Sequence, residues 1–196
     1  MTSFSEVFFC EFYNPKEFKV DLFLIEKKTN TTDKNELANL VTSLAETIAQ
    51  AGGSPVEFFF GEQLQIVYGV SEANSKIILE AGLTKAGIPY DDVSPVRIIG
   101  ATIDEVRERA SEANYLVEWD LPAELTMDTY LQRKKEKSPL YANVPETTFL
   151  RTYVREDMVK CLCLYDAPDD DAVKRAREAV STPIDRLTKI GNINND

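Results

Sequence analysis

The order of secondary structure in this chain is decided by the stretch Lys160–Ile190, "KCLCLYDAPDDDAVKRAREAVSTPIDRLTKI". It aligns with Gln65–Ile99, "QIVYGVSEANSKIILEAGLTKAGIPYDDVSPVRII", and Pro183 falls on Pro89. Each stretch has an apolar run, then apolar residues at helical spacing, then a second apolar run. The alignment therefore predicts strand, helix and strand, present twice in one chain.

The repeat continues on the N-terminal side of both stretches. The apolar runs "LFLIE" and "YLVE" end in Glu26 and Glu118, and each is followed by a helical pattern and a further strand. The complete order, strand-helix-strand-strand-helix-strand, is that of the ferredoxin-like fold, an antiparallel sheet with both helices on one face. We predict two such copies, at residues 20–100 and 114–191.

Local motifs mark where several helices begin and end. Asp33 with Glu36 predicts a capping box at the first helix, and Gly52 follows its last apolar position. Pro139 interrupts the corresponding helix of the second copy and is expected to end or kink it.

Three segments belong to neither copy. Residues 101–113 are predicted to form a linker helix, because Thr102 and Glu105 have capping-box spacing. Residues 1–19 form an apolar extension rich in phenylalanine, which we expect to cover a sheet face or edge, or to bind a partner. Residues 192–196 are a polar tail.

The predicted fold class is α+β. One face of each sheet carries no helix, so two units in one chain can bury these open faces against each other or join their sheets edge to edge. We predict that the two tandem ferredoxin-like units form a pseudo-dimeric sandwich.

The composition is that of a globular protein, with 43% hydrophobic and 28% charged residues. The formal net charge of -11 makes the surface repel phosphate backbones and anionic lipids. We therefore expect neither nucleic acid nor a membrane as a partner, and a cation, a small molecule or another protein fits better. A homodimer that pairs through an unfilled sheet edge is a further alternative.

Cysteine and histidine content limits the chemistry. Three cysteines do not suggest a disulfide framework, and neither a membrane helix nor a leader sequence is evident, so we predict a cytoplasmic protein. The chain has no histidine. The commonest general base and the commonest transition-metal ligand are therefore missing, and any cofactor, such as a divalent metal, would need other ligands.

Cys161 and Cys163 raise a choice between a metal site and a buried strand. In the repeat they fall on Ile66 and Tyr68, which are ordinary strand residues. A soft-metal site would need two further ligands, and only Cys10 remains as a thiol. We interpret the pair as buried strand residues.

Two charged runs have structural interpretations. Residues 169–171 are three aspartates at the start of a helical pattern, where carboxylates cap free N–H groups; a hard-cation site is the alternative. The basic cluster Arg133–Lys137 is expected on a solvated helix, and an anionic partner is the alternative.

Glu26 and Glu118 are the candidate ligand-binding residues, since a carboxylate in an apolar strand is costly to bury unless it is paired. Strand alternation places Glu118 on the open face of the sheet, and Arg151 and Tyr153 on the adjacent hairpin strand are expected nearby. In a structural interpretation each glutamate forms a salt bridge, Glu118 with Arg151. In a functional one, these four residues line a pocket between the sheets, and Glu26 and Glu118 are weak candidates for metal ligands.

The second copy resembles a family of small ferredoxin-like domains of unknown function that includes a nickel-binding protein. The matching residues are "YLVE" at 115–118, "TYV" at 152–154 with Asp157, and "TPIDRLTKI" at 182–190. The first copy is similar to a degenerate second member, and keeps Glu26, "IVYGV" and "GIPYDDV". The resemblance implies a tandem or dimeric α+β sandwich.

One departure from the family pattern limits what can be transferred. Family members have a pattern that resembles "WVHSYV", whereas the corresponding residues 149–154 of this chain are "FLRTYV". Arg151 therefore stands in the place of a histidine. Nickel binding through imidazole therefore cannot be carried over to this chain.

Two functional hypotheses follow. The first is a non-enzymatic binding module that holds a metal ion, a small ligand or a protein partner at the inter-sheet surface. The second is a cofactor-independent enzyme of the dimeric α+β barrel type, in which Glu118 is the base and Tyr153 or Arg151 orients the substrate. The sequence favours the first, because it contains no motif for nucleophilic catalysis, phosphate binding or zinc binding.

Overall fold

A computed structural model describes residues 21–31, 33–61 and 66–191. The expected N-terminal extension, residues 1–19, and the tail, residues 192–196, lie outside these residues. None of the helices in the described part is long and apolar enough to cross a membrane.

The described residues form two runs of the order strand-helix-strand-strand-helix-strand, with a short helix between them. The first run is β1 (Asp21–Lys28), α1 (Lys34–Gln50), β2 (Ser54–Gly61), β3 (Ile66–Ala73), α2 (Lys76–Lys85) and β4 (Asp92–Ile99). Then come α3 (Ile103–Arg109) and the 3-10 turn η1 (Ala110–Glu112). The second run is β5 (Tyr115–Asp120), α4 (Met127–Lys137) with the 3-10 turn η2 (Ser138–Asn143), β6 (Thr148–Arg155), β7 (Lys160–Asp166), α5 (Asp170–Ala179) and β8 (Arg186–Gly191).

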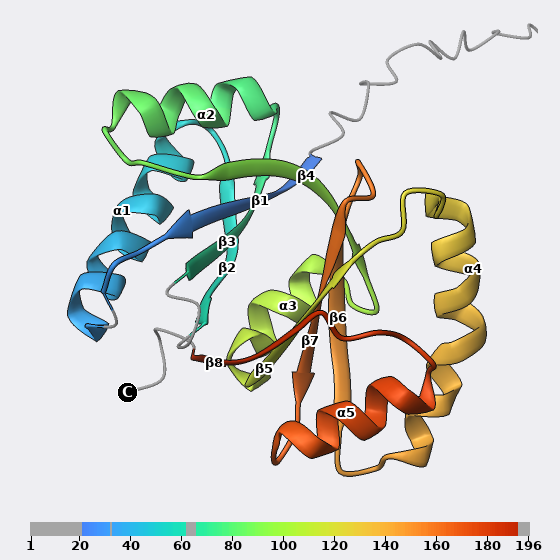
Figure 1. Cartoon of the computed structure of the whole chain (residues 1–196). Coiled ribbons are helices and arrows are strands. Elements are labelled where there is room, and N and C mark those ends of the chain that lie inside the picture. Colours follow the sequence, from blue (N-terminus) through green and yellow to red (C-terminus); the bar gives the residue numbers. More distant parts are fainter. Residues whose placement is uncertain (1–20, 32, 62–65, 192–196) are drawn as a thin grey trace, which may run out of the picture.

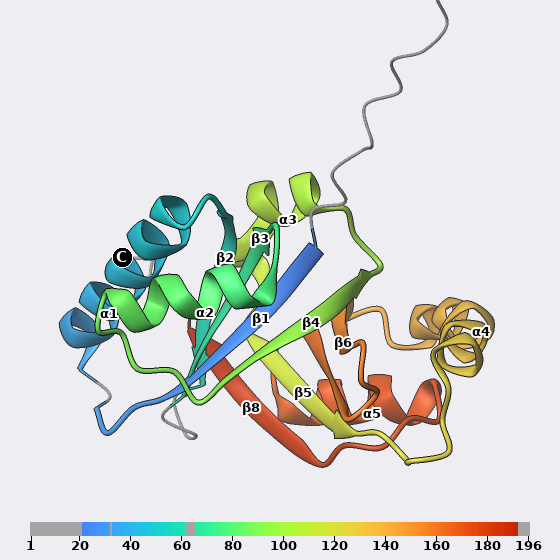
Figure 2. The ribbon, with the colours of Figure 1, turned by 90° about the horizontal axis from the view of Figure 1, so that it is seen from above.

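The strands close into one antiparallel barrel in the order β1-β3-β2-β8-β5-β7-β6-β4. Two pairings join the halves: β4 with β6, where Ile98 lies opposite Tyr153, and β2 with β8, where Gly61 lies opposite Ile190. Four helices lie outside the strands, with α1 and α2 over one half and α4 and α5 over the other (Figure 1, Figure 2).

The predicted pseudo-dimeric sandwich of two ferredoxin-like units is wrong. The two halves share strand edges at both joins instead of stacking their open faces. An edge strand leaves a row of unpaired N–H and C=O groups, and closure of a sheet on itself removes such edges. The inner faces of both halves therefore line a single interior.

The barrel interior is an apolar core to which both halves contribute. Its members include Leu22, Leu24, Phe59, Tyr68, Val70, Leu116, Tyr153, Leu162 and Leu164. Strand β5 alternates as predicted, because Leu116 faces this core while Tyr115, Val117 and Trp119 pack under α4 and α5. A third cluster lies under α1 and α2.

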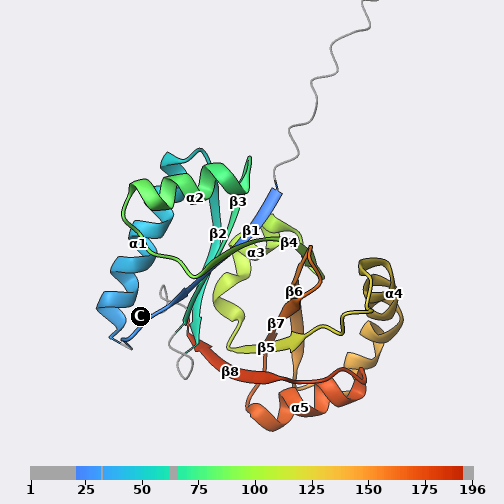
Figure 3. The same cartoon turned by 45° about the horizontal axis from the view of Figure 1, so that its top comes forward.

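Helix α3 covers one end of the barrel. Val106 is only 1% exposed and packs against the interior core together with Ile103. In Figure 3, α3 lies within the outline of the strands. Since α3 follows the last residue of β4, the opposite end of the barrel is the one where β1 and β5 end and β7 begins.

Most of the local sequence predictions are confirmed. Asp33 caps α1 by accepting hydrogen bonds from two backbone N–H groups, and Gly52 follows the helix with a positive φ of 78°. Thr102 and Glu105 form the predicted capping box of α3. Helix α4 ends just before Pro139, which lies in η2.

Candidate functional site at one end of the barrel

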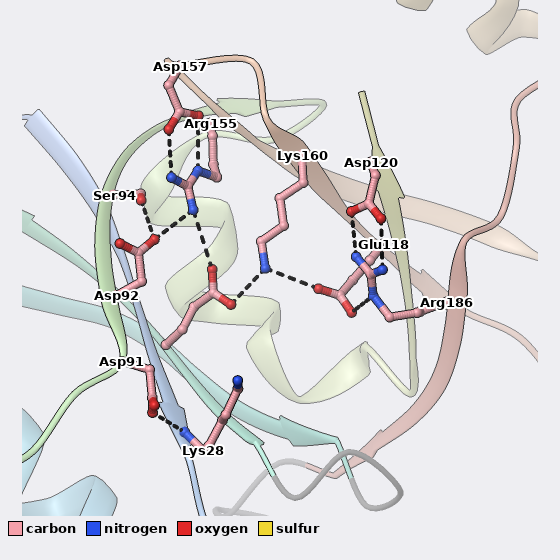
Figure 4. Close-up of polar contacts among 11 residues, drawn as sticks. Lys28, Asp91, Asp92, Ser94, Glu118, Asp120, Arg155, Asp157, Lys160 and Arg186 are labelled. Carbon is pink, nitrogen blue, oxygen red and sulfur yellow. Dashed lines mark hydrogen bonds and ion pairs between the residues drawn. The ribbon is translucent and has the colours of Figure 1, made fainter. Parts of the chain in front are cut away.

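Glu26 and Glu118 come together at the end of the barrel opposite α3. Both face the interior, and they are 7% and 3% exposed. The side chain of Lys160, at the first position of β7, extends toward Glu118 (Figure 4) and also reaches Glu26. Its Nζ donates to Glu26 Oε2 at 2.7 Å and to Glu118 Oε1 at 3.2 Å. One ammonium group therefore bridges carboxylates from the two halves of the chain.

Two arginines surround this bridge. Arg186 Nε donates to Glu118 Oε2 at 2.7 Å, and its other nitrogens bind Asp120 (Figure 4). Arg155 binds Asp92 and Asp157, each at 2.6 Å, and lies 3.9 Å from Glu26 Oε1. We call Glu26, Glu118, Lys160, Arg155, Arg186, Asp92, Asp120 and Asp157 the ion-pair end of the barrel.

The mutual stabilisation of these charges shifts several pKa values. The hydrogen bond from Arg186 lowers the pKa of Asp120, and the hydrogen bond from Arg155 lowers the pKa of Asp157. Burial, followed by the charge of Glu118, raises the pKa of Tyr68 well above its usual range. The two guanidinium groups thus stabilise the charged forms of Asp120 and Asp157.

One oxygen of the ion-pair end has no hydrogen-bond partner. Glu26 Oε1 is shielded from solvent, and no donor in the described part of the chain lies within hydrogen-bond distance of it. A buried carboxylate oxygen without a donor is unfavourable, and such a group calls for an explanation. The contact of Glu26 Oε1 with a charged group is the longer ion pair with Arg155, at 3.9 Å.

A second polar cluster lies deeper in the barrel. Glu57 on β2 accepts hydrogen bonds from Arg151 and Tyr153 on β6, including one from Arg151 Nε at 2.8 Å. All three side chains are almost completely buried. Burial alone would lower the pKa of Arg151, but the hydrogen bonds and charge of Glu57 raise it above the usual range. The cluster is a neutral, satisfied ion pair within an apolar core.

A β-bulge precedes both charged members of this cluster. The register of β2 shifts between Pro55 and Glu57, and that of β6 shifts between Phe149 and Arg151. Bulges commonly redirect side chains. Glu57 and Arg151 therefore occupy matching positions in the two hairpins and carry opposite charges.

The structure separates the four predicted site residues into two groups. Glu26 and Glu118 share Lys160, whereas Arg151 and Tyr153 bind Glu57. The salt bridge predicted between Glu118 and Arg151 is therefore wrong.

Sequence reasoning also missed four functional candidates. The missed residues are Glu57, Arg155, Lys160 and Arg186. Aligning "VEFFF" with "LRTYV" places Glu57 opposite Arg151, so the repeat contained a signal for that ion pair. No comparable signal exists for Lys160, because one partner, Glu118, lies on the neighbouring strand β5 and the other, Glu26, comes from the first half of the chain.

The cysteine pair and the aspartate run take the structural roles expected of them. Cys161 and Cys163 are buried free thiols on β7, packed under the helices. Asp169 caps α5 by accepting from the N–H of Ala172. Within the described residues, no group of three or more Asp, Glu, Cys or His side chains is arranged to hold a metal ion.

The architecture and the ion-pair end define a closed, antiparallel α+β barrel with a charged end. Comparison with solved structures agrees on the fold: the chlorite dismutase-type protein TA0507 superposes with a TM-score of 0.52 at 14% identity, over 87% of this chain and 92% of that chain. A monooxygenase-type protein from Lactobacillus acidophilus NCFM gives a TM-score of 0.47 at 10% identity, over 88% of this chain and 92% of that one. A mutant chlorite dismutase from Candidatus Nitrospira defluvii gives 0.43 at 10% identity, over 87% and 88%.

The second half of the chain has a more specific relationship. Residues 115–190 match the family model described as "Nickel responsive protein SCO4226-like". This match supports the predicted similarity to a nickel-binding-protein-like family over that segment. No curated protein sequence is significantly similar to the chain.

Proposed function

We propose that this protein is a non-enzymatic binding module that takes up a cation at the ion-pair end of the barrel. Glu26 and Glu118 supply the oxygen ligands, and the ligand is a divalent metal ion or an organic ammonium group. The observation that carries this proposal is the position of Lys160, whose ammonium group bridges the two buried carboxylates. A pair of carboxylates that accommodates an internal cation offers the same oxygens to an external one.

Two further features support a cation as the ligand. Glu26 Oε1, which accepts no hydrogen bond, is an additional acceptor beside the bridge. The net charge of -11 also raises the local concentration of cations around the protein. The ammonium group of Lys160 would then compete with the ligand for the two carboxylates, and it would leave them when the ligand binds.

The residues present do not fit imidazole-bound nickel. The chain has no histidine, and Arg151, which occupies the expected histidine position, is bound to Glu57. Two carboxylates do fit a hard, oxygen-preferring ion such as Mg²⁺, which is commonly held by one or two carboxylates and keeps several waters. The similarity of residues 115–190 to a nickel-responsive family supports metal binding in general.

The alternative, a cofactor-independent enzyme, is less well supported by the geometry. Both carboxylate oxygens of Glu118 already have a cationic partner, since one contacts Lys160 and the other contacts Arg186. Arg151 and Tyr153, the proposed orienting groups, are occupied by Glu57. A base and its orienting groups would have to lie together around one substrate.

The double variant Glu26→Gln, Glu118→Gln is expected to lose cation binding. Isothermal titration with Mg²⁺, Ca²⁺, Mn²⁺, Ni²⁺ and spermidine should give at least one saturable binding curve for the wild type and none for the variant. The control Glu108→Gln, Glu124→Gln removes the same charge from exposed positions and should bind as the wild type does. Equal binding by all three proteins would refute the proposed site.

We also propose that the chain consists of two related units, at residues 20–100 and 114–191, joined by 101–113. The repeated order of elements and the matching bulges support this division. A cytoplasmic location is supported by the free thiols Cys161 and Cys163, which suit a reducing compartment.

Fragments 1–100 and 101–196 are expected to associate as a heterodimer when co-expressed, because each leaves two unpaired strand edges that the other can fill. In a homodimer of 101–196, the Arg151 side chains of the two copies would face each other, because no Glu57 is present. Self-association of this fragment should therefore be weaker. Analytical ultracentrifugation of each fragment and of the mixture tests this. Stable monomers of both fragments in the mixture would contradict the two-unit proposal.

Homodimerisation of the whole chain by edge pairing is not expected. The barrel is closed, so every strand in the described residues has a neighbour on both sides. A homodimer would have to use another surface.

A further inference from the structure

A group of polar side chains is buried outside the barrel, between the sheet and the helices α4 and α5. Lys134, on α4, belongs to the basic cluster expected on a solvated face, but its Nζ is shielded from solvent and lies 3.8 Å from the centre of the Phe149 ring. Arg177, on α5, is only 2% exposed. Two cations therefore lie in the same apolar layer.

Three hydrogen-bond donors in this layer have no partner. They are Lys134 Nζ, Arg177 Nε and the hydroxyl of Tyr130, a residue that is 2% exposed. Buried donors without acceptors are rare in folded proteins, since each loses its hydrogen bonds to water without replacement. Three of them in one layer point to an acceptor that is not part of the chain.

The two cations also lack balancing negative charge. Among the described residues, neither Lys134 nor Arg177 has a carboxylate within ion-pair distance. Arg177 donates to the carbonyl of Pro183 and, at 3.4 Å, to the sulfur of Cys163. Hydrogen bonding by Cys161, with the nearby Lys134 and Arg177, lowers the pKa of Cys163. Burial lowers the pKa of Lys134, as expected for an ammonium group without a carboxylate partner.

All three unpartnered donors belong to residues that line one cavity of about 30 Å³. Its lining also includes Trp119, Arg133 and Lys137. A volume of this size holds a monatomic ion or a few water molecules, and is too small for a nucleotide or a sugar phosphate. Four cationic side chains around a small space favour an anion within it.

We propose that the cavity between α4, α5 and the sheet binds a small monovalent anion of the size of chloride, with Lys134, Arg177 and Tyr130 as donors. Each of these residues gives an N–H or O–H group to the anion, and the anion supplies the missing negative charge. The site is separate from the ion-pair end, because Trp119 and Glu118 are neighbours on β5 and point to opposite faces of the sheet.

Trp119 allows this proposal to be tested directly, because it is the only tryptophan of the chain and lines the cavity. Bromide quenches tryptophan fluorescence through contact, whereas chloride does not quench it efficiently. Bromide is titrated into the whole protein at constant ionic strength, with gluconate as the balancing anion because it is too large for the cavity. The expected result is saturable quenching that added chloride reverses.

Variants connect the quenching to the cavity. Lys134→Met is expected to weaken bromide binding by about tenfold or more, because a charge-assisted hydrogen bond is lost. Tyr130→Phe is expected to weaken it by a smaller factor, and Lys174→Met, on the exposed face of α5, should not change it. In gluconate, Lys134→Met should also melt at a higher temperature than the wild type, since it removes an unpaired buried cation.

Three results would overturn the proposal. The first is quenching that rises linearly with bromide and is not reversed by chloride, which indicates random collision. The second is the same saturable binding in Lys134→Met as in the wild type, which places the anion elsewhere. The third is a melting temperature of Lys134→Met in gluconate that is lower than that of the wild type. This result would mean that the Lys134 side chain stabilises the fold without an anion.

Discussion

Replacing Arg151 with methionine is expected to lower the free energy of unfolding by about 3–5 kcal/mol. The substitution leaves the carboxylate of Glu57 buried in the barrel core with Tyr153 as its remaining donor. An unpaired buried charge loses its hydration and gains no counter-charge in return. For a chain of this size the melting temperature should fall by about 10 °C.

Urea denaturation followed by circular dichroism measures this loss. The double variant Glu57→Gln, Arg151→Met should recover part of the stability, because no buried charge remains. Arg175→Met is the matched control, since Arg175 forms an exposed ion pair with Glu146 and its removal should leave the transition nearly unchanged. Equal stability of Arg151→Met and the control would show that the buried pair is not a stabilising unit.

Replacing Lys160 with methionine is expected to raise the affinity for the cationic ligand by about tenfold or more. In the wild type an incoming cation must displace the ammonium group that bridges Glu26 and Glu118. Removal of that group also removes a positive charge that would repel the ligand at a distance of a few ångströms. Titration calorimetry of the variant and the wild type with the same ion measures the change.

The same variant should be less stable than the wild type without ligand and should recover when the ligand is added. Two carboxylates without their shared counter-ion repel each other, and a cation that binds only the folded state restores stability in proportion to its affinity. Lys174→Met should show neither effect, because Lys174 forms an exposed pair with Asp171. A Lys160→Met protein that is destabilised and that no cation in the panel restores would make the ion-pair end purely structural.

The two proposed sites use opposite faces of the same strands. Lys160 extends into the ion-pair end, whereas the next residue, Cys161, packs under α4 and α5 beside the proposed anion cavity. Strand alternation is what allows one strand to serve both sites. A backbone shift of β7 on cation binding would therefore also move the side chains of β7 that pack near the anion cavity.

Much of the local structure could be predicted from the sequence. Helix starts follow from capping residues such as Asp33 and Thr102, whose side chains bind backbone N–H groups within the next turn. The two faces of β5 follow from alternation, and the buried state of Cys161 and Cys163 follows from their alignment with apolar strand residues. These features depend on residues close to one another along the chain.

The candidate site could be predicted only in part. The sequence singled out Glu26 and Glu118, because a carboxylate in an apolar strand is unusual wherever the strand lies. Their partner was not predictable, because Lys160 comes from a third strand and its side chain is long enough to reach several positions. The pairing of Arg151 with Glu118 requires that their strands be adjacent, but β7 lies between β5 and β6, and Arg151 binds Glu57 from the first half.

The sequence by itself determined the order of the elements, their buried faces and the two glutamates that require a counter-charge. Only the tertiary structure decided that the halves close into a barrel, and hence which charges meet. Closure depends on pairings such as Ile98 with Tyr153 and Gly61 with Ile190. These pairings are made by backbone N–H and C=O groups, which are the same in almost every residue, so the local pattern of a strand does not indicate which edge it will join.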